Sequence, residues 1–210
     1  MIVVTDDEPS LAETLADELA ELAWSMRTEF QRTESVPVDQ AVIVADQADD
    51  GLVILSDTGD SVLGGSGGDS TVILEAILRL GIRGRALIPM IDPVSARQLA
   101  QAGSGATVTL ELGGRSAPFF NPLTVTGVVR AASSGVVELA DHAETEINMG
   151  HTLAFDVGPV TLLVTEYAGV AGIHPAVYRH VGIEPADFQI IVMKTASNFQ
   201  YMTPLTSTML

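Results

Sequence analysis

The sequence predicts an α/β protein with a mixed sheet, flanking helices and an antiparallel, β-rich insertion in its second half. In the first half, short apolar runs alternate with helical patterns, which is typical of parallel strands joined by helices. In the second half, short runs of alternating apolar and polar residues follow one another, which is typical of antiparallel strands. Internal repeats and a Ser/Pro/Gly-rich linker are both missing from the sequence. We therefore expect one domain over residues 1–210.

The composition excludes several classes of protein. Hydrophobic residues make up 47% of the chain and charged residues 18%, which is typical of a globular protein. The net charge is −17, and the ten Lys and Arg residues are scattered, so we expect neither a nucleic-acid partner nor an anionic membrane surface. The chain has no cysteine for a disulfide or a thiolate metal site. Because it also has no long apolar run and carries acidic residues early, at positions 6–8, we expect a cytoplasmic protein.

A long amphipathic helix is the first element that the pattern predicts. The acidic residues before Pro9 favour a helix start, and apolar residues recur at every third or fourth position from Leu11 to Phe30. The remaining elements of the first half follow from similar patterns. They are a helix over 38–49, a strand over 52–55, a helix over 71–80 capped by Asp69 or Ser70, a strand over 86–91, and a helix that begins at Asp92-Pro93 and ends at 102.

The second half is predicted to be mainly strands. Alternating or continuous apolar runs indicate strands over 106–112, 123–131, 136–139, 152–155, 160–165 and 188–194. A short helix is predicted over 175–181, and residues 195–210 are expected to form a loop that could begin a helix.

A glycine-rich loop over residues 56–70 leaves the carboxyl end of a predicted strand, where open α/β sheets bind ligands. A phosphate cradle is disfavoured, because a P-loop ends in Lys-Ser/Thr and this loop ends in Asp69-Ser70. Two interpretations stay open: the acidic residues bond the loop's own amides, or the loop faces a substrate or a cation in a cleft. The candidate cleft residues of this loop are Asp57, Asp60, Gly64, Gly65 and Asp69.

A second candidate segment follows the strand predicted at 188–194. Lys194 ends this strand, and Ser197, Asn198 and Phe199 follow it, so these four residues could line the same cleft. The alternative is an ordinary loop in which Lys194 extends its charged end to solvent.

The spacing of the four histidines does not indicate a metal-binding motif. His142, His151, His174 and His180 do not form an HExxH or a similar pattern. Asp57 and Asp60 could do acid–base work only if the fold brings them together. The sequence therefore assigns no catalytic residue and no metal ligand.

Four segments of the chain carry a resemblance to a known family. Residues 57–71 are similar to an acidic, glycine-rich loop written DxGDNxxGGxxGD, with Ser61 where Asn is usual and Gly67 where Pro is common. Residues 192–200 resemble the family's VKxxxxF motif, and weaker matches lie near both ends of the first predicted helix and between residues 92 and 114. Taken together, the segments resemble the C-terminal domain of the microcystinase C (MlrC) family of metallopeptidases.

This resemblance implies a function. In the family, an N-terminal domain supplies His, Asp and Glu ligands to a zinc ion, and a zinc-bound water attacks the substrate. We expect that domain to be absent from this chain, so that the chain alone is catalytically incomplete and zinc belongs to the absent domain. The implied partners are such a metal-binding domain and a peptide or amide-like substrate, which Lys194 or Asn198 would orient.

The alternative is a non-enzymatic binding or assembly module derived from the same domain. A mean hydropathy of +0.33 at a pI of about 4.3 indicates uncovered apolar surface, which could pair with another protein. A homo-oligomer is left open.

Overall fold

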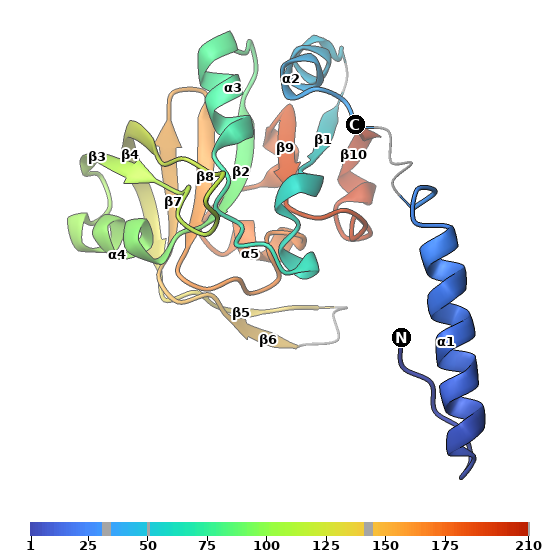
Figure 1. Cartoon of the computed structure of the whole chain (residues 1–210). Coiled ribbons are helices and arrows are strands. Elements are labelled where there is room, and N and C mark those ends of the chain that lie inside the picture. Colours follow the sequence, from blue (N-terminus) through green and yellow to red (C-terminus); the bar gives the residue numbers. More distant parts are fainter. Residues whose placement is uncertain (31–34, 50, 141–144, 210) are drawn as a thin grey trace. The chain divides into compact units, whose positions relative to one another are not determined.

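The structure is a computed structural model that describes residues 1–30, 35–49, 51–140 and 145–209 (Figure 1). The chain divides into two compact units, Met1–Val36 and Pro37–Leu210. The expectation of a single domain over the whole chain stays a prediction. His142 lies outside the described residues.

The first unit contains helix α1 (Pro9–Ser25), followed by turns that extend to Phe30. Its start at Pro9 agrees with the sequence pattern, because a proline lacks the N–H that the first helical turn leaves unpaired. The helix contains no buried residue.

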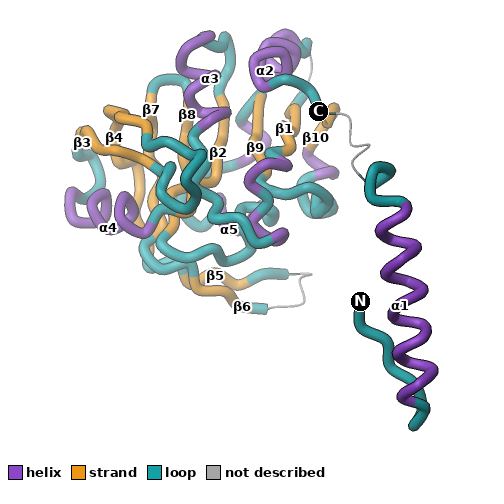
Figure 2. Tube along the Cα trace, viewed as in Figure 1, coloured by secondary structure: helices purple, strands orange, loops and turns teal. Residues whose placement is uncertain are grey.

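The second unit is built on an eight-stranded sheet with the order β10-β1-β9-β2-β8-β7-β4-β3, which can be followed in Figures 1 and 2. Strands β10, β1, β9, β2 and β8 are parallel, whereas β7, β4 and β3 add antiparallel neighbours. The strands of this sheet are β1 (Leu52–Ser56), β2 (Ala86–Ile91), β3 (Thr107–Leu112), β4 (Leu123–Ser133), β7 (Thr152–Val157), β8 (Val160–Thr165), β9 (Ile190–Met193) and β10 (Thr206–Met209). The predicted α/β class with a mixed sheet is confirmed.

Helices cover the two faces of the sheet unequally. One buried cluster joins alternate strand residues to α2 (Val38–Gln47), α3 (Val72–Leu80) and α4 (Pro93–Ala102). The opposite cluster joins the other strand residues to the short helix α5 (Pro175–Arg179) and to a separate hairpin. That hairpin consists of β5 (Val136–Glu138) and β6 (Glu146–Asn148), paired antiparallel. Single-turn helices lie at Thr58–Asp60, Val62–Gly64, Pro185–Asp187 and Thr203–Leu205.

The pairing between the neighbouring strands β2 and β9 ends before Pro89. Strand β2 pairs with β8 along its whole length, but it pairs with β9 only at Ala86 and Leu87. Pro89 has no backbone N–H to donate, so it is disfavoured in a strand with a neighbour on both sides. The carboxyl ends of β2 and β9 are therefore not bonded to each other, although β1 and β9 stay paired as far as Met193.

Two predictions about individual elements are wrong. Residues 206–209 form β10 on the edge of the sheet, where the sequence pattern had indicated a loop or a helix start. The N-cap of α3 is Thr71, which makes no side-chain capping bond, and not Asp69 or Ser70, although the Ser70 hydroxyl accepts from the Val72 amide at 3.4 Å.

None of the helices in the described part of the chain combines the length and the apolar character needed to cross a bilayer. The cytoplasmic location stays a prediction.

Candidate functional site

The glycine-rich loop after β1 fills the gap between β9 and β2. The amide of Val62 donates to the carbonyl oxygen of Lys194 at 3.0 Å, just past the end of β9. On the other side, the amide of Ile91 in β2 donates to the carbonyl oxygen of Gly68 at 3.0 Å. The loop thus supplies the backbone partners that β9 and β2 do not give each other. The loop itself therefore occupies the position at the carboxyl ends of the strands, where α/β sheets bind ligands.

Only glycine fits at position 68 of this loop. Its φ is +79°, and an added Cβ would lie 2.5 Å from Ile91 Cδ1 and 2.8 Å from Val62 Cγ2. The close approach of the loop backbone to β2 therefore requires a residue without a side chain.

A buried ion pair lies beneath the loop. Lys194 Nζ is 2.8 Å from Asp60 Oδ2 and 3.3 Å from Asp57 Oδ2, and it also donates to the carbonyl oxygen of Ser70 at 3.2 Å. The side chain of Lys194 is 1% exposed and that of Asp60 is fully buried. The interpretation of Lys194 as a surface lysine extended to solvent is therefore wrong.

Asp60 also holds the loop's own backbone. Its carboxylate accepts from Ser66 Oγ at 2.6 Å and from the amides of Gly68 and Ser70, both at 2.8 Å. The acidic residue thus bonds its own loop, as one of the two open interpretations predicts. Whether the loop also faces a substrate stays a prediction.

Asp60 does not suit acid–base chemistry. Burial would raise the pKa of this carboxyl, but the charge of Lys194 and the hydrogen bonds from Lys194, Ser66 and Ser70 outweigh it and lower the pKa below its ordinary value. The fold does bring Asp57 and Asp60 together, since both contact the same ammonium. However, a carboxylate that is ionised and fully engaged at neutral pH is neither a proton donor nor a strong base.

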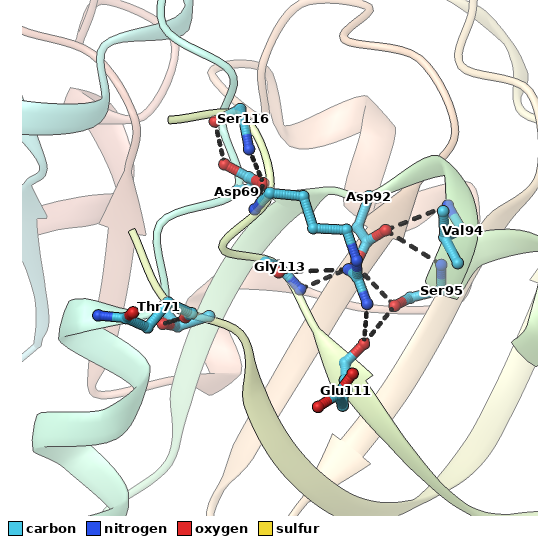
Figure 3. Close-up of polar contacts among 10 residues, drawn as sticks. Asp69, Thr71, Asp92, Val94, Ser95, Glu111, Gly113 and Ser116 are labelled. Carbon is cyan, nitrogen blue, oxygen red and sulfur yellow. Dashed lines mark hydrogen bonds and ion pairs between the residues drawn. The ribbon is translucent and has the colours of Figure 1, made fainter. Parts of the chain in front are cut away.

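Asp69 joins the glycine-rich loop to the loop between β3 and β4. Its carboxylate accepts from the backbone amides of Arg115 at 2.6 Å and Ser116 at 2.9 Å, and from the hydroxyl of Ser116. Figure 3 shows Asp69 facing Ser116. The amide of Gly114 in turn donates to the carbonyl oxygen of Asp69 at 2.8 Å. These bonds fix the two loops against each other.

Asp92, at the end of β2, holds loop backbone as Asp60 and Asp69 do, and we call these three buried aspartates the anchors. One oxygen caps α4 by accepting from the amides of Val94 and Ser95, each at 3.1 Å (Figure 3). The other oxygen accepts from the Ser95 hydroxyl at 2.6 Å and the Gly113 amide at 2.8 Å. Burial would raise the pKa of Asp92, but these hydrogen bonds and the nearby Arg115 lower it below its ordinary value.

The guanidinium of Arg115 completes this anchor. Its Nη1 lies 2.6 Å from Asp92 Oδ2, and its Nη2 donates to the carbonyl oxygen of Glu111 at 2.6 Å. Arg115 therefore ties the end of β3 to the end of β2, while its own amide bonds Asp69. Arg115 thus links Asp69 and Asp92.

The remaining sequence-predicted candidates lie nearer the surface. Gly64 and Gly65 are exposed at the far end of the glycine-rich loop, and Gly65 has a φ of +98°. Ser197 is exposed, and Asn198 and Phe199 are half-buried. The amides of Ser197 and Asn198 donate to the buried hydroxyl of Thr195 at 3.3 and 3.1 Å, which orients this turn directly after Lys194. No contact in the structure tests whether these residues face a substrate.

The carboxylates at this edge do not fit a zinc site. Asp60, Asp69 and Asp92 are buried and already accept several hydrogen bonds or contact a cation. Within residues 1–30, 35–49, 51–140 and 145–209, no group of three or more His, Asp or Glu residues could hold a metal ion. No metal-dependent step can be assigned to these side chains.

Sequence reasoning missed the roles of Asp92 and Arg115. Asp92 was identified only as a helix start, and Arg115 was not singled out. A signal does exist: Gly113 and Gly114 precede Arg115, and paired glycines indicate a tight backbone approach. An added Cβ at Gly113, whose φ is +61°, would collide with the carbonyl oxygen of Asp69.

Fold and site together define a class of protein: an α/β domain whose strand-end crevice is closed by its own loop over a buried lysine–aspartate pair. The chain belongs to the family described as MlrC C-terminus, whose model matches residues 55–208. The confirmed resemblance thus covers the glycine-rich loop and the segment after β9.

The known proteins that are similar to the chain include a named enzyme and a solved structure. Microcystinase C from Sphingomonas sp. is 24% identical over 149 residues, which cover 70% of this chain and 29% of that protein. A crystal structure from Mesorhizobium sp. BNC1, named a candidate metallopeptidase, matches with a TM-score of 0.79 and 27% identity. That match covers 92% of this chain and 39% of the solved chain. The chain thus spans well under half the length of both relatives.

Proposed function

We propose that this chain acts as the C-terminal, cleft-forming domain of a zinc-dependent hydrolase of the metallopeptidase or amidohydrolase type. The observation that carries this proposal is the family match over residues 55–208, which includes both candidate segments at the carboxyl edge of the sheet. The names of the two relatives support the reaction class, and the share of each relative that the chain covers supports a role as one part of a larger enzyme.

In this proposal the two loops of the carboxyl edge form one wall of the cleft. The buried anchors Asp60, Asp69 and Asp92 keep the loop backbones in place without taking part in the chemistry. The outer parts of the same loops, at the exposed Gly64, Gly65 and Ser197 and the half-buried Asn198, would contact a peptide or amide-like substrate. A metal-binding domain of the same family would form the opposite wall and supply the zinc ion and its ligands, so that this chain alone is catalytically incomplete.

A complementation experiment tests the proposal. The chain is mixed with, or fused to, the part of the Mesorhizobium protein that lies outside the matched region, and hydrolysis of peptide amides is measured with added zinc. We expect activity that neither part has alone. If the fusion folds, binds zinc and hydrolyses no amide, the proposed function is wrong.

Variants of the outer parts of these loops test the site within the active fusion. We expect Asn198→Ala to lower kcat/KM about tenfold, because a polar group of the substrate loses its hydrogen-bond partner. Ser104→Ala serves as the control, because this exposed serine lies in the turn between α4 and β3. If Asn198→Ala and Ser197→Ala both leave kcat/KM unchanged, the assignment of this segment to the cleft is wrong even though the domain role stands.

A further inference from the structure

The turn over residues 195–199 is fixed at both of its ends. At its start, the hydroxyl of Ser56 at the end of β1 donates to the carbonyl oxygen of Thr195 at 2.8 Å. At its other end, the carbonyl oxygen of Phe199 accepts from the amides three and four residues later, both at 2.9 Å. All of these contacts lie within the unit Pro37–Leu210. The backbone path between the two ends then depends on contacts inside the turn.

Inside the turn, one buried hydroxyl holds two successive amides. The hydroxyl oxygen of Thr195 accepts from the amide of Ser197 at 3.3 Å and from the amide of Asn198 at 3.1 Å. A threonine side chain that bonds the amides two and three residues ahead favours one turn conformation over the others. The backbone of Asn198, and with it the direction of its side chain, therefore depends on the Thr195 hydroxyl.

Thr195 is too deeply buried to contact a bound molecule itself. It is 1% exposed, whereas Ser197 is exposed and Asn198 is half-buried. Its hydroxyl also already holds the two amides of the turn. An effect of Thr195 on a bound substrate must therefore pass through the residues that it holds.

We infer that Thr195 is a positioning residue, whose buried hydroxyl sets the direction in which Asn198 presents its side-chain amide to the substrate. This inference rests on the proposed function and deepens it by naming how the second segment of the cleft is oriented. A side-chain amide both donates and accepts hydrogen bonds, so it suits a peptide group, which does the same. Such pairing needs accurate placement, because small displacements of an orienting group weaken it strongly.

Substitutions at Thr195 in the active fusion test the inference. Thr195→Val keeps the shape of the side chain and removes the acceptor, so we expect KM to rise about tenfold with kcat within about twofold. Thr195→Ser keeps the hydroxyl and should leave KM within about twofold of the wild type. In a fusion that already carries Asn198→Ala, Thr195→Val should raise KM by less than about twofold, because its effect passes through Asn198.

Thr161→Val is the matched control for the loss of a buried threonine hydroxyl. Thr161 is also 1% exposed, and its hydroxyl donates to Asp156 at 2.7 Å. It lies at the amino end of β8, at the edge of the sheet opposite to the candidate site. A loss of stability alone reduces the amount of folded enzyme and hence the apparent kcat. We therefore expect Thr161→Val to lower the Tm while leaving KM within about twofold of the wild type.

Hydrogen exchange in the unsubstituted chain provides a test that needs no folded variant. The amides of Ser197 and Asn198 should exchange at least about tenfold more slowly than the same amides in an unfolded peptide, because the Thr195 hydroxyl holds both. NMR-detected exchange measures these rates. If both amides exchange as fast as in the unfolded peptide, the hydroxyl does not hold the turn and the inference is wrong.

The kinetic outcomes separate this inference from the proposed function. The inference alone is wrong if Asn198→Ala lowers kcat/KM but Thr195→Val leaves KM unchanged, or if the effects of the two changes multiply. It is also wrong if Thr195→Ser raises KM as much as Thr195→Val, or if Thr161→Val raises KM equally. If Asn198→Ala and Ser197→Ala both leave kcat/KM unchanged, the assignment of this segment to the cleft is wrong, and the inference fails with it.

Discussion

The ammonium group of Lys194 lies 2.8 Å from the carboxylate of Asp60, and neither side chain is more than 1% exposed. Lys194 follows β9 and Asp60 follows β1, so the pair joins the ends of two neighbouring parallel strands. Buried charges are costly to transfer from water, and only partners with good geometry offset this cost. Each member of the pair therefore depends on the other.

Removal of the lysine charge should destabilise the fold strongly. In Lys194→Met the carboxylate of Asp60 stays buried without its cation, so we expect the free energy of unfolding to fall by about 3–5 kcal/mol. Urea unfolding at pH 7 measures this change. The double variant Asp60→Asn/Lys194→Met should recover only part of the loss, because the fully buried charge is removed while Asp57, whose side chain is 13% exposed, still lacks its cation. The exposed pair Arg79–Asp39 provides the control, since Arg79→Ala should cost less than about 1 kcal/mol. Equal losses for the buried and the exposed pair would contradict this account.

The stability of the chain should fall in acid. The pKa of Asp92 is lowered in the folded state, so this group contributes stability that is complete above the pKa of the unfolded chain, about 3.9, and is lost as pH falls through the folded pKa. We expect the free energy of unfolding, measured in urea from pH 6 to pH 3, to drop below about pH 4. In Asp92→Asn the drop should be shallower, because one proton fewer is taken up on unfolding. A variant with the slope of the wild type would show that Asp92 does not cause the effect.

Glycine should be required at position 113 for space as well as for backbone conformation. Gly113→Ala adds a methyl group that collides with the Asp69 carbonyl oxygen, whereas Gly65→Ala, in the left-handed region at a φ of +98° and a ψ of 8°, meets no atom within 4 Å. Both changes cost the strain of a positive φ, about 1–2 kcal/mol. We expect Gly113→Ala to lower the free energy of unfolding by at least about 1 kcal/mol more than Gly65→Ala. Equal losses in urea unfolding would mean that the loops separate without cost.

Loss of the Asp69 carboxylate should free the loop between β3 and β4. In Asp69→Ala the amides of Arg115 and Ser116 lose their acceptor, so we expect hydrogen exchange at these two amides to become faster. The amide of Gly113 bonds Asp92 and should keep its protection, which makes it the internal control. If NMR-detected exchange at all three amides rises together, Asp69 stabilises the whole domain and not this loop in particular.

Much of the fold could be predicted because apolar periodicity and terminal residues are local signals. The strand over Val160–Thr165 and the start of α4 at Asp92 agree with the sequence pattern, since a buried strand is continuously apolar and Asp-Pro is a strong helix start. Strand β10 escaped prediction because Thr206–Met209 is a short edge strand whose polar and apolar residues follow no strong period.

The candidate site could be located but not explained from the sequence. Asp57, Asp60, Asp69 and Lys194 were identified because they lie at, or in the loops that follow, the carboxyl ends of predicted strands. The rule that open α/β sheets bind ligands at these ends needs only the order of the elements. Which partner each charge takes depends on segments far apart in the chain. Asp60 meets Lys194, 134 residues away, and Arg115 bonds Asp92 across the end of β3.

The pairing of β1 has a consequence for how the chain folds during synthesis. Strand β1 precedes the other strands of this sheet in the sequence, yet both of its neighbours, β9 and β10, come after the rest of them. Such distant pairings are slow to form, and a strand that waits for them keeps exposed backbone edges that favour aggregation. The antiparallel strands β3, β4, β7 and β8 can pair among themselves much earlier. The nascent chain would thus form the β3–β4–β7–β8 part of the sheet first. Strand β1 would join only after Ile190–Met193 has left the ribosome.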